Sequence, residues 1–210
     1  NERAAVHAAI ADLARQHNLH IIGSDLALNE AGKMTNTAVF INNHGHTIAS
    51  YDKIHLFQLM GEHLHLSGGD RLTTADTDWG KMGLSICYDL RFPVFSRNRF
   101  NNTVPDGYDY DLLIFVANWP SPRHFAWQTL LKARAIENLC YLVGVNRVGT
   151  DGNGLQYLGA STVLDFSGQS LVECGSQTQV QTARVSYTEL HAFRQRFPFH
   201  LDADAFTILD

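Results

Sequence analysis

The sequence has few cysteines, few prolines and no long apolar run. Its three cysteines, Cys87, Cys140 and Cys174, are an odd and sparse set for 210 residues, which argues against a disulfide framework. They form no CxxC pair, so a cysteine-based zinc site is not expected. No stretch of about 18 apolar residues occurs, and the first residues do not follow the signal-peptide pattern. We therefore expect a cytoplasmic protein without a membrane partner.

Charge and composition narrow the class further. The chain has 21 acidic and 16 basic residues, a net charge of −5, which argues against a nucleic-acid partner. A hydrophobic content of 45% with so small a net charge excludes intrinsic disorder, while 16 glycines and 5 prolines exclude collagen-like sequence. A chain of 210 residues is long enough to bury a core, so we expect one domain over residues 1–210.

The hydrophobic pattern alternates between helical and strand spacing. Helices are expected over residues 2–17, 92–100, 124–138 and 187–196, and strands over 19–23, 37–41, 46–51, 72–77, 81–87, 112–116, 140–145, 157–164, 170–173 and 178–185. Strands and helices alternate in the middle of the chain, and the last third is rich in strands. This order predicts an α/β layered domain with a mixed sheet or sheets.

The strongest local motif is the sequence around Cys87. An apolar strand delivers this cysteine to its C-terminal end, and a helix is expected to begin within a few residues. Ligands of α/β sheets bind beyond such strand ends. The N-terminus of a helix favours a thiolate and can hold an oxyanion. The alternative is a cysteine that serves only as a small buried apolar residue.

A second motif contains Lys53, which follows a half-buried strand in an apolar context. A buried ammonium group needs an anionic partner, whereas a surface lysine would need none. Nearby, Glu62, His63 and His65 allow a metal site to be considered, because His-x-His on a strand places both rings on one face. No third ligand has a compelling spacing, so we expect no metal, and a metal-dependent hydrolase is kept only as an alternative.

A third motif, at residues 118–123, follows another apolar strand. An arginine and a tryptophan at the end of a strand are typical of a pocket wall for a ligand that carries a carboxylate. A rigid, proline-containing surface loop is the alternative. On the next expected helix, Arg134 and Glu137 are three residues apart, which indicates a structural ion pair.

These motifs, in this order, resemble the nitrilase superfamily of carbon–nitrogen hydrolases. Residues 51–57 resemble its lysine motif, residues 83–93 its cysteine motif, and residues 133–138 and 159–163 its later helix and strand. The segment from Cys87 to Pro93, together with residues 116–120, looks most like the bacterial omega-amidase branch. That branch hydrolyses the terminal amide of 2-oxo-acid amides, such as 2-oxoglutaramate and 2-oxosuccinamate.

The resemblance implies a four-layer αββα sandwich and thiol chemistry without a metal or organic cofactor. Cys87 would be the nucleophile that forms a thioester. Lys53 and the backbone N–H of Tyr88 would form the oxyanion site. Glu62 would match the family's second, supporting glutamate. These roles agree with the need of amide hydrolysis for an activated nucleophile and preorganised positive charge.

One expected residue has no match in this sequence. The family's general-base glutamate lies upstream of the first expected helix, and Glu2 lies on that helix itself. We therefore expect a preceding segment that carries the first strand, the first helix and this base.

Substrate binding and assembly rest on fewer residues. Arg123 is our candidate for pairing with the substrate carboxylate and Arg91 is the second, while Asn118, Trp119 and Phe125 would shape the pocket. The family resemblance also implies a homodimer. Two alternatives stay open: another carbon–nitrogen hydrolase of nitrilase or carbamoylase type, and a non-catalytic member of the superfamily.

Overall fold

The computed structural model describes residues 2–104 and 107–208. Its helices are α1 (Glu2–His17), α2 (His124–Asn138) and α3 (Tyr187–Arg196). Its strands are β1 (Ile21–Leu28), β2 (Met34–Ile41), β3 (Thr47–Asp52), β4 (Thr73–Thr77), β5 (Gly80–Ile86), β6 (Leu112–Ala117), β7 (Tyr141–Asn146), β8 (Val148–Thr150), β9 (Gln156–Leu158), β10 (Thr162–Leu164) and β11 (Ser170–Glu173). Short 3-10 turns include η1 (Gln58–Met60), η2 (Glu62–Leu64), η3 (Cys87–Arg91), η4 (Ser121–Arg123) and η5 (Phe199–Asp202).

Most of the strands form two sheets. The first is antiparallel, with the order β1-β2-β3, and the second has the order β11-β10-β7-β6-β5-β4. Within the second sheet, β5, β6 and β7 are parallel neighbours. Their C-terminal ends therefore meet at one edge, which is where the sequence motifs place the candidate residues.

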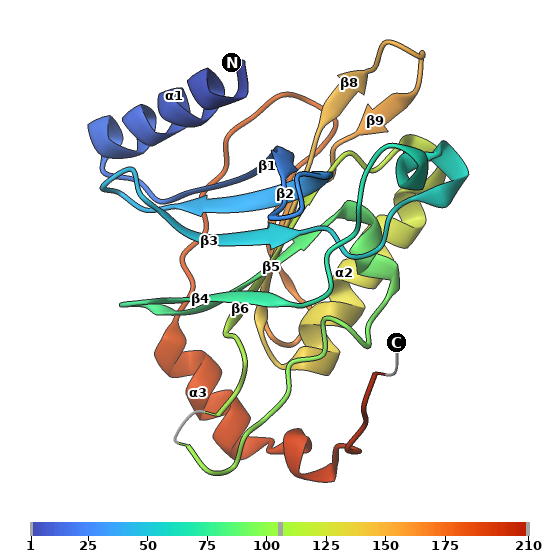
Figure 1. Ribbon diagram of the computed structural model, residues 1–210. Coiled ribbons are helices and arrows are strands. Elements are labelled where there is room, and N and C mark those ends of the chain that lie inside the picture. The colour runs from blue at the N-terminus through green and yellow to red at the C-terminus, as the bar shows by residue number, and fades with distance from the viewer. Residues whose placement is uncertain (1, 105–106, 209–210) are drawn as a thin grey trace.

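The two sheets pack face to face between helices, which confirms the four-layer αββα arrangement (Figure 1). Phe40 and Tyr51 of the first sheet lie in one core with Leu84 and Ile86 of the second. The outer face of the first sheet is covered by α1, and a further core joins the other face of the second sheet to α2. Burial of these apolar side chains, at roughly 25 cal/mol per Å², is what holds the layers together.

The helix α3 lies at the opposite end of the parallel strands from their C-terminal edge (Figure 1). Its buried Arg194 donates to the carbonyl of Leu139, before β7, and to the carboxylate of Asp111, before β6. This ion pair secures the N-terminal ends of the strands and leaves their C-terminal ends to the candidate site.

Three sequence-based expectations about elements are wrong. Residues 92–100 form turns and irregular backbone instead of a helix, and the buried side chain of Asn98 there bonds to the backbone of Tyr110 and Asn138. The strand expected over 157–164 is divided into β9 and β10, since Gly159 and Ala160 both have positive φ, 65° and 54°. Residues 178–185 are irregular and mostly exposed, and they have no sheet neighbour in the described part of the chain.

Candidate active site

The candidate site lies where three parallel strands end. Cys87 follows β5 directly, Asn118 follows β6, and Asn146 is the last residue of β7. The Cys87 Sγ lies 3.8 Å from the carbonyl oxygen of Asn118. Asn146 fixes the loop after β6, because its side chain accepts from the N–H of Trp119 at 2.7 Å and donates to the carbonyl of Trp119 at 3.0 Å. The edge predicted to carry the chemistry is therefore built from three separate segments.

Cys87 has an unusual backbone conformation, with φ of 47° at the start of η3. Positive φ costs a residue other than glycine about 1–3 kcal/mol, so its surroundings must maintain it. The N–H of Ile86 donates to Asp89 Oδ2 at 3.1 Å, which closes the turn from inside. Arg134 Nη2 of α2 donates to the carbonyl of Leu90 at 2.6 Å, and this anchors the turn from the helix layer. Arg134 also pairs with Glu137 at 2.8 Å, as expected from their spacing.

Lys53 is buried, with 3% of its surface exposed, and it has the anionic partner that burial requires. Its Nζ lies 2.5 Å from Glu62 Oε2, which also accepts from the N–H of Phe57 at 2.6 Å. The Nδ2 of Asn36 on β2 reaches the other carboxylate oxygen at 3.4 Å. The structure thus brings Lys53 and Glu62 together and excludes the alternative of a surface lysine.

Burial and charge act in opposite directions on the two acids of the site. Burial raises the pKa of the Cys87 thiol, and the opposing influence of Lys53 is smaller, so the pKa lies above its ordinary value. For Glu62, burial is the largest single influence and raises the pKa. The hydrogen bonds from Lys53 and Phe57 and the charge of Lys53 together outweigh it and lower the pKa. The thiolate expected from the sequence is therefore not favoured in this structure, because burial outweighs the nearby cation.

The remaining thiols have different surroundings from Cys87. Cys140 is fully buried, and this raises its pKa to about 12. Cys174 lies just beyond β11, two strands from β7 at the same edge of the sheet, and its N–H donates to the carbonyl of Ser161 at 2.8 Å. Lys53 is among the charges that lower the pKa of Cys87, whereas for Cys140 the charge that lowers the pKa is Arg194.

Arginines and aromatic rings surround the predicted site. Arg123 lies over the ring of Phe57 at 4.9 Å, and that ring packs against Tyr88 at 4.7 Å. Arg91 lies over the ring of Trp119 at 5.1 Å. Trp119 itself is buried, and its Nε1 donates to the carbonyl of Arg123 at 2.7 Å, so its ring supports both arginines.

Two other predicted groups lie apart from this cluster. Phe125 is 80% exposed, which does not suit the wall of a closed pocket. His63 and His65 are exposed in and after η2 and not on a strand, so the expected strand geometry for a metal site is wrong. Within residues 2–104 and 107–208, no group of three or more His, Cys, Asp or Glu side chains is placed to hold a metal ion.

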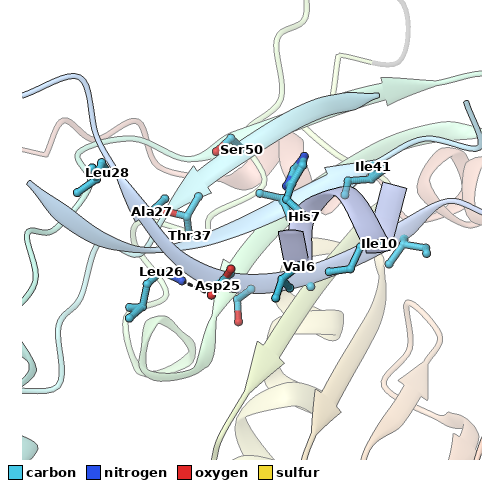
Figure 2. A pocket seen from close by; sticks show the side chains of 14 residues that line it. Val6, His7, Ile10, Asp25, Leu26, Ala27, Leu28, Thr37, Ile41 and Ser50 are labelled. Carbon is cyan, nitrogen blue, oxygen red and sulfur yellow. Dashed lines mark hydrogen bonds between the residues drawn. The ribbon is translucent and has the colours of Figure 1, made fainter. Parts of the chain in front are cut away.

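A cavity of about 450 Å³ lies elsewhere, between α1 and the first sheet. Figure 2 shows its lining side chains, which come from α1, β1, β2 and, at Ser50, β3. Most of the lining is apolar, and it includes none of Cys87, Lys53 and Glu62. The cavity is therefore separate from the candidate active site.

In the described chain, no helix has the length and apolar character needed to span a membrane.

Sequence reasoning did not assign a role to Asp89, Tyr51, His55 or Asn146. Asp89 and Tyr51 are buried and joined by a hydrogen bond of 2.8 Å, and His55 Nδ1 lies 2.9 Å from Asp89. A signal was present in Asp89, since an acidic residue beside an apolar strand end needs partners if it is buried. Asn146 ends an apolar strand that is parallel to β6, as Asn118 follows β6 itself.

Comparisons with known proteins identify the family of this chain. The carbon–nitrogen hydrolase family matches residues 2–195. The omega-amidase YafV of Yersinia enterocolitica is 45% identical over 192 residues, which are 90% of this chain and 71% of that protein. The 2-oxoglutaramate amidase of Bacillus subtilis strain 168 is 34% identical over 88% of this chain and 69% of its own length.

A solved structure extends the comparison to the fold. XC1258 from Xanthomonas campestris, a CN-hydrolase superfamily protein with an arsenic adduct in its active site, has a TM-score of 0.91 and 45% identity to this chain. The match covers 96% of this chain and 75% of that one. The protein therefore belongs to the carbon–nitrogen hydrolase family, the nitrilase superfamily that its lysine and cysteine motifs resemble, and is an enzyme of that family.

Proposed function

We propose that this enzyme is a thiol amidase that hydrolyses the terminal amide of small 2-oxo-acid amides, such as 2-oxoglutaramate and 2-oxosuccinamate. The names of the omega-amidase and 2-oxoglutaramate amidase relatives support this substrate class. The single observation that carries the chemistry is the buried Lys53–Glu62 pair, whose lysine charge acts on the Cys87 thiol at the strand ends.

In the first step, the Cys87 sulfur attacks the amide carbon. A sulfur–carbon bond forms, the carbonyl becomes an oxyanion, and the thiol proton passes to the departing nitrogen. The carbon–nitrogen bond then breaks, which leaves a thioester and free ammonia. Because burial raises the pKa of Cys87, the thiol needs a base to remove its proton. We assign this step to no residue of the printed sequence, since none matches the family's general-base glutamate.

In the second step, water attacks the thioester carbon. The carbon–sulfur bond breaks, the carboxylic acid leaves, and Cys87 regains its proton. Both steps pass through an oxyanion, which Lys53 and the backbone N–H of Tyr88 would stabilise. Glu62 would hold the Lys53 ammonium in place through the 2.5 Å contact. A fixed cation at the position where negative charge develops is worth more than a mobile one, because it needs no reorganisation.

The first test is ammonia release from a panel of amides by the purified full-length enzyme and its Cys87→Ser variant. We expect 2-oxoglutaramate to be hydrolysed and the variant to lose at least about 10³-fold in kcat, because a serine hydroxyl is a far weaker nucleophile here. Cys174→Ser is the matched control and should keep its activity. Turnover that survives in Cys87→Ser would remove this thiol from the mechanism.

The same panel separates the alternatives. A nitrile and an N-carbamoyl amino acid test the nitrilase and carbamoylase types, and preferential turnover of either would reject the omega-amidase proposal. Activity that is lost in EDTA and restored by a divalent metal would favour the metal-dependent hydrolase. No detectable hydrolysis of any substrate would favour a non-catalytic member of the superfamily. The homodimer and the cytoplasmic location expected from the sequence are also proposals, and light scattering of the purified chain tests the first.

A further inference from the structure

A buried carboxylate joins the two segments that carry Cys87 and Lys53. Asp89 is 3% exposed and receives four hydrogen bonds. Oδ2 accepts from the Ile86 N–H at 3.1 Å and from the Tyr51 hydroxyl at 2.8 Å. Oδ1 accepts from the His55 N–H at 2.9 Å and from His55 Nδ1 at 2.9 Å. Each oxygen thus takes one backbone and one side-chain donor.

The donors to Asp89 come from the segments that carry Lys53 and Cys87. Tyr51 and His55 lie two residues before and two residues after Lys53, while Ile86 immediately precedes Cys87. Tyr51 comes from β3 of the first sheet, and Asp89 lies in η3 beyond β5 of the second. One carboxylate therefore bridges the two sheets. It holds the Tyr51 side chain before the lysine, the His55 backbone after it and the Ile86 backbone before the cysteine.

Neighbouring contacts make this junction rigid. The Tyr51 hydroxyl also accepts from the N–H of Ile54, at 3.4 Å. The His55 ring stacks on Phe92, with centroids 3.9 Å apart and planes 8° apart, and Phe92 follows the same turn as Cys87. Since a carboxylate only accepts, His55 Nδ1 carries the proton in this contact.

We propose that Asp89 is a positioning residue that sets the placement of the Lys53 ammonium relative to the Cys87 thiol. This inference rests on the proposed thiol chemistry and adds a residue to it. Asp89 touches neither the thiol nor the lysine ammonium through a hydrogen bond; it acts through the segments that carry them. A misplacement of reacting groups by about 1 Å can cost about 10²-fold in rate, so a shared anchor has a measurable effect.

A role for Asp89 through its charge and a role through positioning predict opposite changes in the pKa of Cys87 when Asp89 is replaced. The Asp89 carboxylate raises the pKa of Cys87, and Lys53 lowers it. If Asp89 acted only through its charge, neutralising it would lower the thiol pKa and speed alkylation at neutral pH. If Asp89 holds Lys53 in place, its loss would weaken the lysine's influence, raise the thiol pKa and slow alkylation.

The experiment measures carboxamidomethylation of Cys87 by iodoacetamide, by peptide mass spectrometry across pH 6–10, roughly from below to above the ordinary thiol pKa. The key variant is Asp89→Asn, because an amide has one accepting oxygen and must leave either the Ile86 or the His55 N–H without an acceptor. Asp111→Asn is the matched control. It changes a carboxylate of similar burial, 7% exposed, at the opposite end of the parallel strands.

We expect Asp89→Asn to alkylate about tenfold more slowly at pH 7, the change produced by one unit of thiol pKa. Its kcat on 2-oxoglutaramate should fall about 10²-fold with little change in KM. Asp111→Asn should match the unmodified chain in both. Alkylation at Cys87 that is unchanged or faster in Asp89→Asn overturns the proposal, whatever happens to turnover.

Three milder variants keep the test decisive if Asp89→Asn does not fold. Tyr51→Phe removes one hydrogen-bond donor to Asp89 and keeps the ring. Like Asp89→Asn, it should slow the alkylation of Cys87. His55→Asn places an amide N–H near the position of Nδ1, whereas His55→Gln places it farther out, so His55→Asn should retain more reactivity. The reverse order, or faster alkylation in Tyr51→Phe, contradicts the proposal. If the unmodified full-length enzyme releases no ammonia from any amide, the proposed function fails, and the alkylation comparison still decides the role of Asp89.

Discussion

At the scale of single residues, the site is a balance of burial against charge. Lys53 is buried because Glu62 neutralises it, and the pKa of Glu62 is lowered because Lys53 and a backbone N–H bind its carboxylate. Cys87 lies close enough to this pair for Lys53 to lower its pKa, yet burial keeps the thiol protonated at rest. Turnover by a protonated thiol depends on proton removal, because the thiolate is the nucleophile.

The sequence motif at residues 118–123 leads to a residue-scale prediction about substrate choice. Arg123 is half-buried, and its guanidinium lies over Phe57 beside the Lys53–Glu62 pair. We expect Arg123→Ala to raise KM for 2-oxoglutaramate about 10- to 100-fold, since a hydrogen-bonded charge contributes about 1.5–3 kcal/mol. The KM for a neutral amide should change little. Steady-state kinetics on both substrates measure this difference.

The control for this prediction is Arg99→Ala, which removes an exposed arginine that is paired with Asp109. It should leave both KM values unchanged. Equal increases for the charged and the neutral amide in Arg123→Ala would show that Arg123 supports the site without recognising a carboxylate. Arg91, over Trp119, would then be the next candidate.

At the scale of elements, the helix α2 holds the nucleophile turn by lying very close to the second sheet. A Cβ atom at Gly144 of β7 would lie 2.6 Å from Leu131 and 3.0 Å from Trp127, both fully buried side chains of α2. Glycine at this position therefore permits the close approach. Through Arg134, one turn farther along α2, the same approach reaches the carbonyl of Leu90 in η3.

This packing predicts that Gly144→Ala destabilises the protein by about 1–3 kcal/mol, the usual cost of overpacking a core. Urea unfolding followed by circular dichroism measures the difference. Gly152→Ala is the matched control, because a Cβ there meets no atom within 4 Å and its φ is not positive. An equal effect of both substitutions would mean that the distance between α2 and β7 is not what limits packing.

The elements also show where sequence patterns were sufficient. The apolar period over 124–138 and 187–196 predicted α2 and α3 with their observed bounds, because each helix buries one continuous side. The pattern failed over 92–100, where the side chain of Asn98 imposes turns. Asn98 donates to the carbonyls of Tyr110 and Asn138, both at 2.8–2.9 Å. Such partners lie 12 and 40 residues away and leave no local periodicity.

At the scale of the whole molecule, the αββα sandwich explains why only part of the site could be predicted. Cys87 and Lys53 each belong to a recognisable motif, and Glu62 was expected as the family's supporting glutamate. The Asp89 junction could not be predicted, because its partners Tyr51 and His55 lie 38 and 34 residues away, in β3 of the other sheet and in the segment after it. Face-to-face packing of the sheets creates that junction, and no local pattern encodes it.

The central claim is that Cys87 becomes acylated during hydrolysis of the amide. Rapid mixing of the enzyme with 2-oxoglutaramate, acid quenching and peptide mass spectrometry test it directly. We expect a peptide that contains Cys87 to gain the mass of the acyl group, and we expect no such gain at Cys140 or Cys174. Release of ammonia in the same reaction, with Cys87 unmodified at every quench time and acyl mass on another residue, would contradict the account.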